Sequence, residues 1–115
     1  MRLLLLVGLV VLSCGSAAPS REIVIAMNEF AFLPDTIEVS PGERVRLTLK
    51  NIGRVDHEFA PDQRARAFGV PHIHLGHSES ASRDWTAPAK ADELQIVCGL
   101  PGHREAGMVA RIIVR

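Results

Sequence analysis

The stretch Arg44-Val-Arg-Leu-Thr-Leu-Lys50 alternates polar and apolar side chains along its whole length. Because successive side chains of a β-strand point to opposite faces, this alternation predicts a strand with its apolar side chains inward and its charged ones outward. The turn-forming sequence Ser40-Pro-Gly-Glu43 precedes the stretch, and Asn51-Ile-Gly53 follows it. The stretch therefore predicts a fold built from short strands joined by turns.

Similar strand-like segments lie on both sides of this stretch. No window of the sequence keeps the apolar period of about 3.6 residues that marks a long helix, and only residues 62–68 are expected to form a short helical segment. Residues 30–34 read as an apolar turn, and residues 60–81 as a long surface excursion. Regularly spaced strands predict an all-β fold, an antiparallel sandwich or barrel of about seven strands. The expected strands are residues 21–27, 36–39, 44–50, 57–59, 82–86, 93–98 and 108–114.

The length and composition limit the classes of function. A chain of 115 residues is enough for one small domain. Its formal net charge is zero, which gives no electrostatic reason to bind nucleic acid. Aromatic residues make up only 4% of the chain and tyrosine is absent, so a stacking platform for bases or sugars is not expected. We expect a monomer with no nucleic-acid partner.

The N-terminus has the plan of an export signal rather than of a folded domain. Met1-Arg2 is positive, residues 3–12 are apolar, and residues 13–20 are small and polar. This run is too short for a stable membrane anchor. We therefore assign residues 1–18 to a signal segment with its linker, and residues 19–115 to the folded domain, exported to the periplasm or cell envelope.

Two ways of processing that signal remain open. Val11-Leu-Ser-Cys14 is similar to a bacterial lipobox, in which the cysteine is lipidated and becomes the new N-terminus. The alternative is ordinary cleavage near Gly15-Ser-Ala-Ala18, which gives a protein without an anchor. In the first case Cys14 would be a lipid anchor and the only contact with a membrane.

Cys14 is either lipidated or removed with the signal, so Cys98 is the one free thiol expected in the mature chain. An internal disulfide is therefore not expected. A lone thiol in an oxidising compartment is a liability unless it is buried or bound to metal. The segment Cys98-Gly-Leu-Pro-Gly-His103-Arg-Glu-Ala-Gly-Met108 places a thiolate, an imidazole and a thioether close together, and His57 lies upstream. One cysteine, two histidines and a weak axial methionine are the ligands of a blue-copper site.

These residues resemble the cupredoxins, the family of blue copper proteins. Four residues lie between Cys98 and His103, and four between His103 and Met108, as in the ligand loop of some members. The N-terminal half is also similar, with His57 at the place of the first histidine ligand. The segments that carry this second similarity are Phe32-Leu-Pro34, Ile37-Glu-Val39, Pro41-Gly-Glu43, Val45-Arg-Leu47 and Asn51.

The resemblance implies a Greek-key β-sandwich that binds one type 1 copper through His57, Cys98, His103 and Met108. It implies a protein that is not itself an enzyme but carries single electrons between redox partner proteins of the cell envelope, with His103 as the exit. The chain departs from the family at Glu58, where many members have asparagine directly after the first histidine. It also has no aromatic residue two or four positions before the cysteine. These departures affect the redox potential and the partner surface rather than the ligand set.

A second group of histidines lies at His72, His74 and His77. These imidazoles would form a second copper or zinc site, a relay beside the first site, or a solvated loop without a metal. The first possibility supports an alternative function, in which the protein stores, delivers or detoxifies copper. A metal-free structural or adhesive sandwich is a third possibility. A multicopper oxidase within one chain is excluded because its trinuclear centre needs more than the five histidines present, and a CuA centre would need a second cysteine in the loop.

Overall fold

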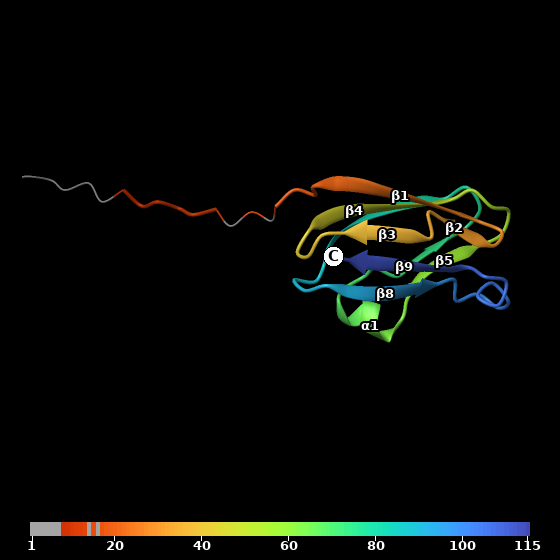
Figure 1. Ribbon diagram of the computed structural model, residues 1–115. Helices are drawn as coiled ribbons and strands as arrows, with labels where there is room; N and C mark the ends of the chain where they lie inside the picture. The colour runs from red at the N-terminus through yellow and green to blue at the C-terminus, as the bar shows by residue number, and fades with distance from the viewer. Residues whose placement is uncertain (1–7, 14, 16) are drawn as a thin grey trace, which may run out of the picture.

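The structure is a computed structural model that describes residues 8–13, 15 and 17–115. Two sheets lie face to face and form a sandwich, with one short helix beside them (Figure 1). The expected all-β sandwich is confirmed. The elements are β1 (Arg21–Asn28), β2 (Ala31–Leu33), β3 (Thr36–Val39), β4 (Arg44–Asn51), β5 (His57–Pro61), α1 (Gln63–Ala67), β6 (Ile73–Leu75), β7 (Ser80–Thr86), β8 (Asp92–Val97) and β9 (Val109–Val114).

The two sheets are mixed rather than purely antiparallel. The first has the strand order β2-β1-β4-β7 and the second β3-β9-β8-β5-β6. Most neighbours run antiparallel, as expected, but β1 pairs with β4 and β3 pairs with β9 in parallel. The parallel pairs arise where the chain changes sheet. Since β3 lies in the second sheet, β1 and β4 become neighbours without a hairpin between them.

Two strands of three residues are not predicted by the sequence. Residues 31–33, expected within an apolar turn, form β2 by pairing with the end of β1. Residues 73–75, expected within the surface excursion, form β6 by pairing with β5. Runs this short contain too few residues for an alternating pattern to stand out. The sandwich therefore has nine strands among the described residues rather than about seven.

The core lies between the sheets and is built from the inward side chains of the alternating strands. Val45, Leu47 and Leu49 of β4 are fully buried, as the sequence predicts. Trp85 of β7 is buried as well, and its indole Nε1 donates a hydrogen bond to the carbonyl oxygen of Phe68 at 2.9 Å. A buried indole N–H needs such a partner. The bond ties β7 to the segment that follows α1.

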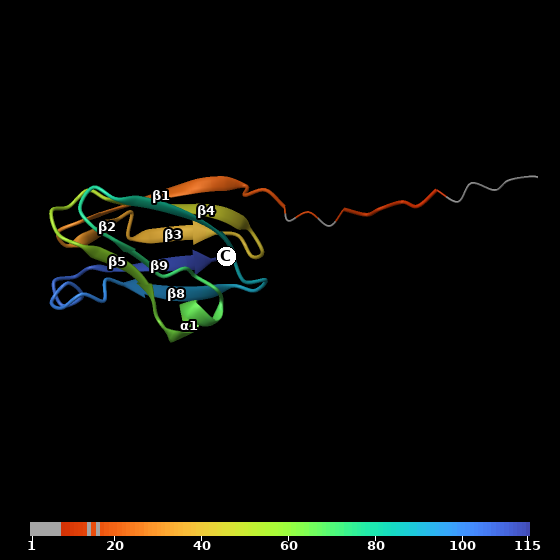
Figure 2. The same ribbon diagram turned by 180° about the vertical axis from the view of Figure 1, so that it is seen from behind.

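Helix α1 confirms the short helical segment expected at residues 62–68. Asp62 is its N-cap, and the carboxylate Oδ1 accepts a hydrogen bond from the backbone N–H of Ala65 at 2.7 Å. This satisfies one of the donors that a helix leaves free at its start. The helix lies against β8 and β5 (Figure 2), with Ala65 buried at the contact.

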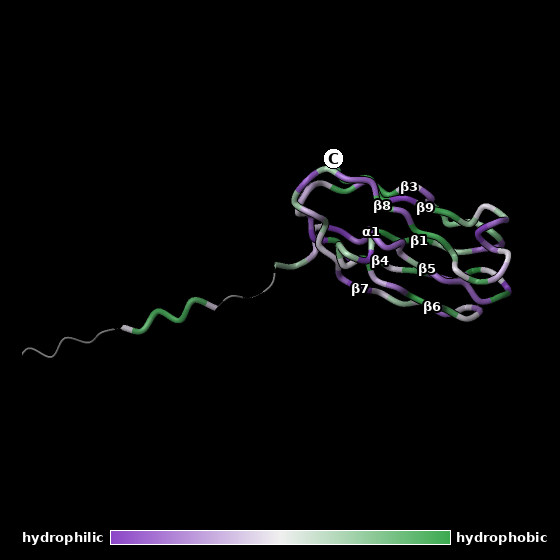
Figure 3. Tube along the Cα trace, turned by 90° about the horizontal axis from the view of Figure 1, so that it is seen from below, coloured by the Kyte–Doolittle hydropathy of each residue, from purple (hydrophilic) through white to green (hydrophobic). Residues whose placement is uncertain are grey.

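The segment before β1 lies outside the sandwich. Residues 8–13 are exposed and mainly apolar, and they stand out in green in Figure 3. The lipidation candidate Cys14 lies outside the described residues, as do residues 1–7 and 16. Among the residues that are described, no helix has the length and apolar character needed to cross a membrane. The boundary between residues 18 and 19, and the choice between the two kinds of processing, stay predictions.

The start of β1 is held by an ion pair that should make stability depend on pH. Glu43 accepts hydrogen bonds from Arg21 Nε at 3.0 Å and from the backbone N–H of Ser40 at 3.0 Å, with Ser20 as a further donor. These donors, Arg21 first, lower the pKa of Glu43 from 4.5 to about 2. A carboxylate with a depressed pKa stabilises the fold above its unfolded-state pKa and loses that effect as the pH falls toward its folded-state pKa.

We expect Glu43→Gln to destabilise the protein by about 1 kcal/mol at pH 7, a value reduced by solvent screening because Arg21 is half exposed. The difference from the wild type should stay constant above about pH 5 and shrink toward zero near pH 2. Urea unfolding at several pH values measures it. A difference that does not change between pH 7 and pH 2 would contradict this assignment.

Candidate metal centre

Three loops meet at the end of the sandwich that lies away from the N-terminal segment (Figure 1). They are the β1–β2 turn at Glu29 and Phe30, the β4–β5 loop, and the long β8–β9 loop. His57 is the first residue of β5. Cys98 directly follows β8, and Met108 directly precedes β9. His57, Cys98 and Met108 thus lie at, or one residue beyond, the end of a paired strand, whereas His103 lies in the middle of the β8–β9 loop.

The structure brings three of the predicted ligands together. One donor atom each from His57, Cys98 and His103 lies within 4.8 Å of the other two. The Cys98 Sγ lies 3.3 Å from His103 Nδ1, and the centroids of the two imidazole rings are 5.1 Å apart. His57 and Cys98 are fully buried, whereas His103 is half-buried. Within residues 8–13, 15 and 17–115, this is the one group of three or more such side chains close enough to hold a metal ion.

The β8–β9 loop is closed by backbone hydrogen bonds that place Met108 beside Cys98. The N–H of Cys98 donates to the carbonyl oxygen of Met108, and the N–H of Met108 donates to that of His103, both at 3.1 Å. Gly102 and Gly107 have φ values of +82° and +100°, which other residues rarely adopt. The side chain of Met108 is fully buried. The fourth predicted ligand therefore belongs to the same compact loop.

His57 has the state that a metal ligand requires. Burial lowers its pKa and so favours the neutral imidazole, although the neighbouring Glu29 carboxylate opposes this effect. Its Nε2 lies 3.3 Å from Glu29 Oε1, where an N–H can donate to the carboxylate. Its Nδ1 is buried and has no hydrogen-bond partner among the described residues. A buried nitrogen acceptor without a partner is costly unless it binds something. Nδ1 is thus the nitrogen that would bind a metal.

The environment of Cys98 also fits a metal thiolate. The thiol is free and buried, and the backbone N–H of Glu58 donates to Sγ at 3.3 Å. Such a donor stabilises negative charge on sulfur. Gly99 leaves room for the neighbouring side chain, since a Cβ at this position would lie 2.7 Å from Glu58 Oε2. Thiolate and imidazole donors together suit copper or zinc rather than magnesium or calcium.

The three histidines of the second group do not converge on one point: His72 and His74 share Glu58 as a partner, whereas His77 has a different one. His74 lies between two carboxylates, with Asp56 Oδ2 at 3.0 Å and Glu58 Oε1 at 3.2 Å, and these raise its pKa. His72 lies 3.6 Å from Glu58. His77 instead forms a hydrogen bond of 2.6 Å between its Nδ1 and the carbonyl oxygen of Gly53. Two of the three imidazoles thus surround Glu58 and the third supports the β4–β5 loop.

Sequence reasoning misses two residues that touch the centre. Phe30 lies with its ring centroid 4.7 Å from that of His103 and 6.4 Å from that of His57, and it is 41% exposed. Glu29 contacts His57 as described above. Both belong to the β1–β2 turn, far from the ligands in sequence, and no spacing rule connects them. A phenylalanine at the start of the expected apolar turn is the one signal that the sequence offers.

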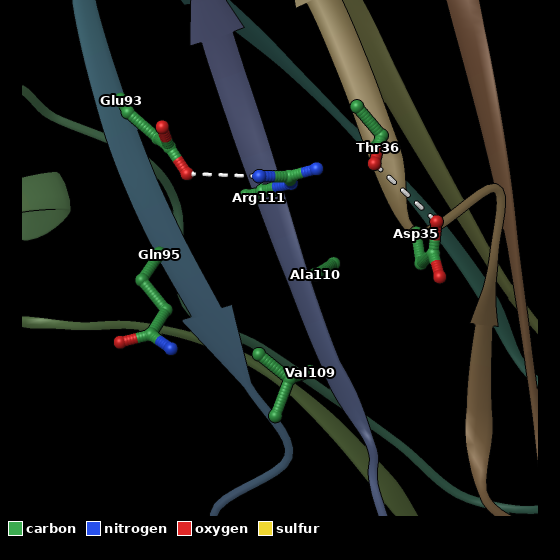
Figure 4. Close-up of a pocket in the computed structure, with 7 residues that line it drawn as sticks. All are labelled: Asp35, Thr36, Glu93, Gln95, Val109, Ala110 and Arg111. Atoms are coloured by element: carbon green, nitrogen blue, oxygen red, sulfur yellow. Dashed lines mark hydrogen bonds and ion pairs between the residues drawn. The ribbon is translucent and has the colours of Figure 1, made fainter.

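A separate hollow of about 550 Å³ lies on the outer face of the second sheet (Figure 4). Arg111 of β9 pairs there with Glu93 of β8 at 3.3 Å. No histidine or cysteine lines this hollow, so it is not part of the metal centre. The lining residues are Asp35, Thr36, Glu93, Gln95, Val109, Ala110 and Arg111.

Comparisons with known proteins agree with the fold. The profile of the Cupredoxin-like domain matches residues 1–110. The chain is 32% identical over 120 residues to the copper-resistant cuproprotein CopI of Rubrivivax gelatinosus, covering 88% of this chain and 71% of that protein. It is 28% identical over 144 residues to the protein of the same name from Pseudomonas aeruginosa, covering 87% and 79% of the two chains.

Solved structures show the same fold. Reduced auracyanin from Roseiflexus castenholzii superimposes with a TM-score of 0.68 at 22% identity, over 85% of this chain and 99% of that one. At this identity the likeness concerns the fold alone. Together with the match of nearly the whole sequence to the domain profile, it establishes the family. The chain belongs to the cupredoxins.

Proposed function

We propose that this protein is an exported copper protein that binds one copper ion through His57, Cys98, His103 and Met108 and carries single electrons in the cell envelope. The observation that supports this most is the meeting of a buried thiol with two imidazoles within 4.8 Å. His57 comes from the start of β5 and the other two from the β8–β9 loop, so closeness in sequence does not explain the cluster. One thiolate, two imidazoles and a weak methionine are the ligands of type 1 sites.

Copper held by these ligands would supply a reversible one-electron couple. The chain contributes a frame that changes little between the two oxidation states. Both Cys98 and Met108 are tied by backbone hydrogen bonds within the β8–β9 loop, and His57 is held by its bond to Glu29. The N–H of Glu58 points at the thiolate and tunes its electron density. A fixed geometry keeps the rearrangement that accompanies electron transfer small.

His103 is the ligand through which electrons would enter and leave. It is half-buried, whereas the other ligands are fully buried. The ring of Phe30 lies against it and is itself 41% exposed. A redox partner that docks at this end of the sandwich would therefore come closest to the metal at His103.

A second function is favoured by the named relatives. Two proteins called copper-resistant cuproprotein match most of this chain, at 32% and 28% identity. In such a role copper would be the cargo, to be stored, delivered or detoxified in the envelope. The carboxylates and imidazoles around Glu58 would then serve as a transfer site beside the main centre.

Copper stoichiometry separates these two functions. We expect the wild type and the triple variant His72→Ala, His74→Ala, His77→Ala each to bind one copper and to show the same reversible one-electron wave in voltammetry. That outcome supports an electron carrier and argues against a transfer site at the second histidine group. Binding of additional copper by the wild type, lost in the triple variant, would favour copper handling. Isothermal titration with Cu(II), combined with metal analysis after dialysis, gives the stoichiometry.

A further inference from the structure

Glu29 in the β1–β2 turn reaches the metal centre from outside the ligand loops. Its carboxylate Oε1 lies 3.3 Å from His57 Nε2. The side chain is 32% exposed, while His57 is fully buried. The contact therefore links a buried imidazole to a carboxylate at the edge of solvent.

The same carboxylate oxygen is held by the loop that precedes β5. The backbone N–H groups of Arg54 and Val55 donate to Glu29 Oε1 at 2.6 and 3.1 Å. Hydrogen bonds to the charged form of a carboxylate favour that form. Glu29 is thus an ionised and fixed acceptor at neutral pH.

The backbone at Gly53 leaves room for the contact between Glu29 and His57. A Cβ at Gly53 would lie 2.3 Å from Glu29 Oε1 and 2.9 Å from His57 Nε2, so only glycine fits without displacing the pair. Asn51 fixes the loop, because its side chain accepts from the N–H of Gly53 at 2.9 Å and donates to the carbonyl oxygen of Val55 at 2.8 Å. The loop is therefore built around the carboxylate.

In a neutral imidazole one nitrogen carries the proton and the other has a free lone pair, so the hydrogen bond of the first decides which nitrogen can bind a metal. With the Nε2–H of His57 donating to Glu29, the lone pair on Nδ1 is left for a metal, and Nδ1 is the buried atom that lacks a partner. Metal-binding histidines commonly donate their other N–H to a carboxylate, which fixes the tautomer and makes the ligand a stronger donor.

We propose that Glu29 is a positioning residue for the copper site, which holds His57 in the tautomer that binds copper and places a negative charge near the metal. This inference rests on the proposed copper function. The charge favours Cu(II) over Cu(I), because the more positive ion gains more from a nearby anion in a partly dry site. Glu29 therefore lowers the reduction potential.

Three variants test this role. Glu29→Gln keeps the shape and an acceptor oxygen but removes the charge, and Glu29→Ala removes both. Glu105→Gln, in the exposed part of the β8–β9 loop, is the control for loss of an exposed carboxylate from another loop at this end of the sandwich. We expect Glu29→Gln to weaken Cu(II) binding about tenfold with little change for Cu(I). A tenfold loss confined to Cu(II) raises the potential by about 59 mV.

The apoprotein gives a readout that does not depend on copper. In the ¹⁵N NMR spectrum of the imidazoles, wild-type His57 should be in the Nε2–H form, whereas Glu29→Ala should show a mixture of tautomers and Glu29→Gln should keep the wild-type form. A pure Nε2–H form in Glu29→Ala would overturn the positioning role. A potential in Glu29→Gln equal to that of Glu105→Gln would overturn the electrostatic role. If the wild type binds no copper, the proposed function fails and the electrostatic role fails with it, while the tautomer still decides whether Glu29 positions His57.

Discussion

In the Cys98→Ser protein we expect the intense visible absorption of the copper-loaded wild type to be absent. That absorption would come from charge transfer between the thiolate and Cu(II), and a serine hydroxyl cannot replace the sulfur. Copper affinity should fall by more than the roughly hundredfold that marks the loss of an outer partner of a ligand. Spectrophotometric titration with Cu(II) in competition with a chelator measures both effects.

The fold should survive this substitution. The serine hydroxyl would occupy the place of the thiol, where the N–H of Glu58 and the imidazole of His103 already lie within 3.3 Å of Sγ. Unchanged circular dichroism of the apoprotein checks this point. The matched control is Met108→Leu, which removes the weak axial ligand from the same loop and should keep the strong absorption. A Cys98→Ser protein with the spectrum and affinity of the wild type would show that Cys98 is not a ligand.

The largest loss of stability is expected from Phe59→Ala. Phe59 lies two residues after His57 in β5, is fully buried, and meets the ring of Phe32 edge to face at 5.9 Å between centroids. Truncating such a ring removes its buried apolar surface and leaves a cavity, at a cost of about 3–5 kcal/mol. Aromatic pairs of this geometry add about 0.5–1.5 kcal/mol beyond their burial, which is part of that loss. Urea unfolding of the apoprotein gives the free energy.

Phe68→Ala is the control for loss of a phenyl ring at the surface. Phe68 is 39% exposed, and its side chain contacts the Arg64 guanidinium at 5.7 Å from the ring centroid. The hydrogen bond from Trp85 is accepted by the backbone carbonyl oxygen of Phe68, which the substitution leaves in place. We expect a loss below about 1 kcal/mol. Equal losses in the two variants would contradict the assignment of Phe59 to the centre of the core.

The sequence predicts the sandwich well where alternation is long. In β4 the inward residues Val45, Leu47 and Leu49 are fully buried, although Thr48, which the alternation places outward, is buried as well. It does not predict which neighbours run in parallel, because side chains alternate in the same way in both kinds of pair. The parallel pairing of β1 with β4 depends on where the chain changes sheet, and that is a property of the whole topology.

The residues of the metal centre also fall into those that the sequence predicts and those that it does not. Cys98, His103 and Met108 could be predicted because one loop carries them at a recognisable spacing, and His57 begins a strand. Glu29 could not be predicted, because its contact with His57 joins the β1–β2 turn to the start of β5, and only the fold brings these together.

The second histidine group shows what sequence spacing leaves open. Close spacing suggested that three imidazoles could converge. In the structure His74 pairs with Glu58 across β5 and β6, while His77 lies beyond the strand and bonds to Gly53. Nearness in sequence did not decide the direction in which these side chains point.

We propose above all that a thiolate, two imidazoles and a thioether of this chain form a type 1 copper site. The most direct test is the visible absorption and EPR spectrum of the wild-type protein loaded with one equivalent of Cu(II). We predict an intense blue absorption and the narrow copper hyperfine splitting of a thiolate-bound type 1 site. A colourless complex with the wide splitting of an ordinary tetragonal Cu(II) site would contradict the account.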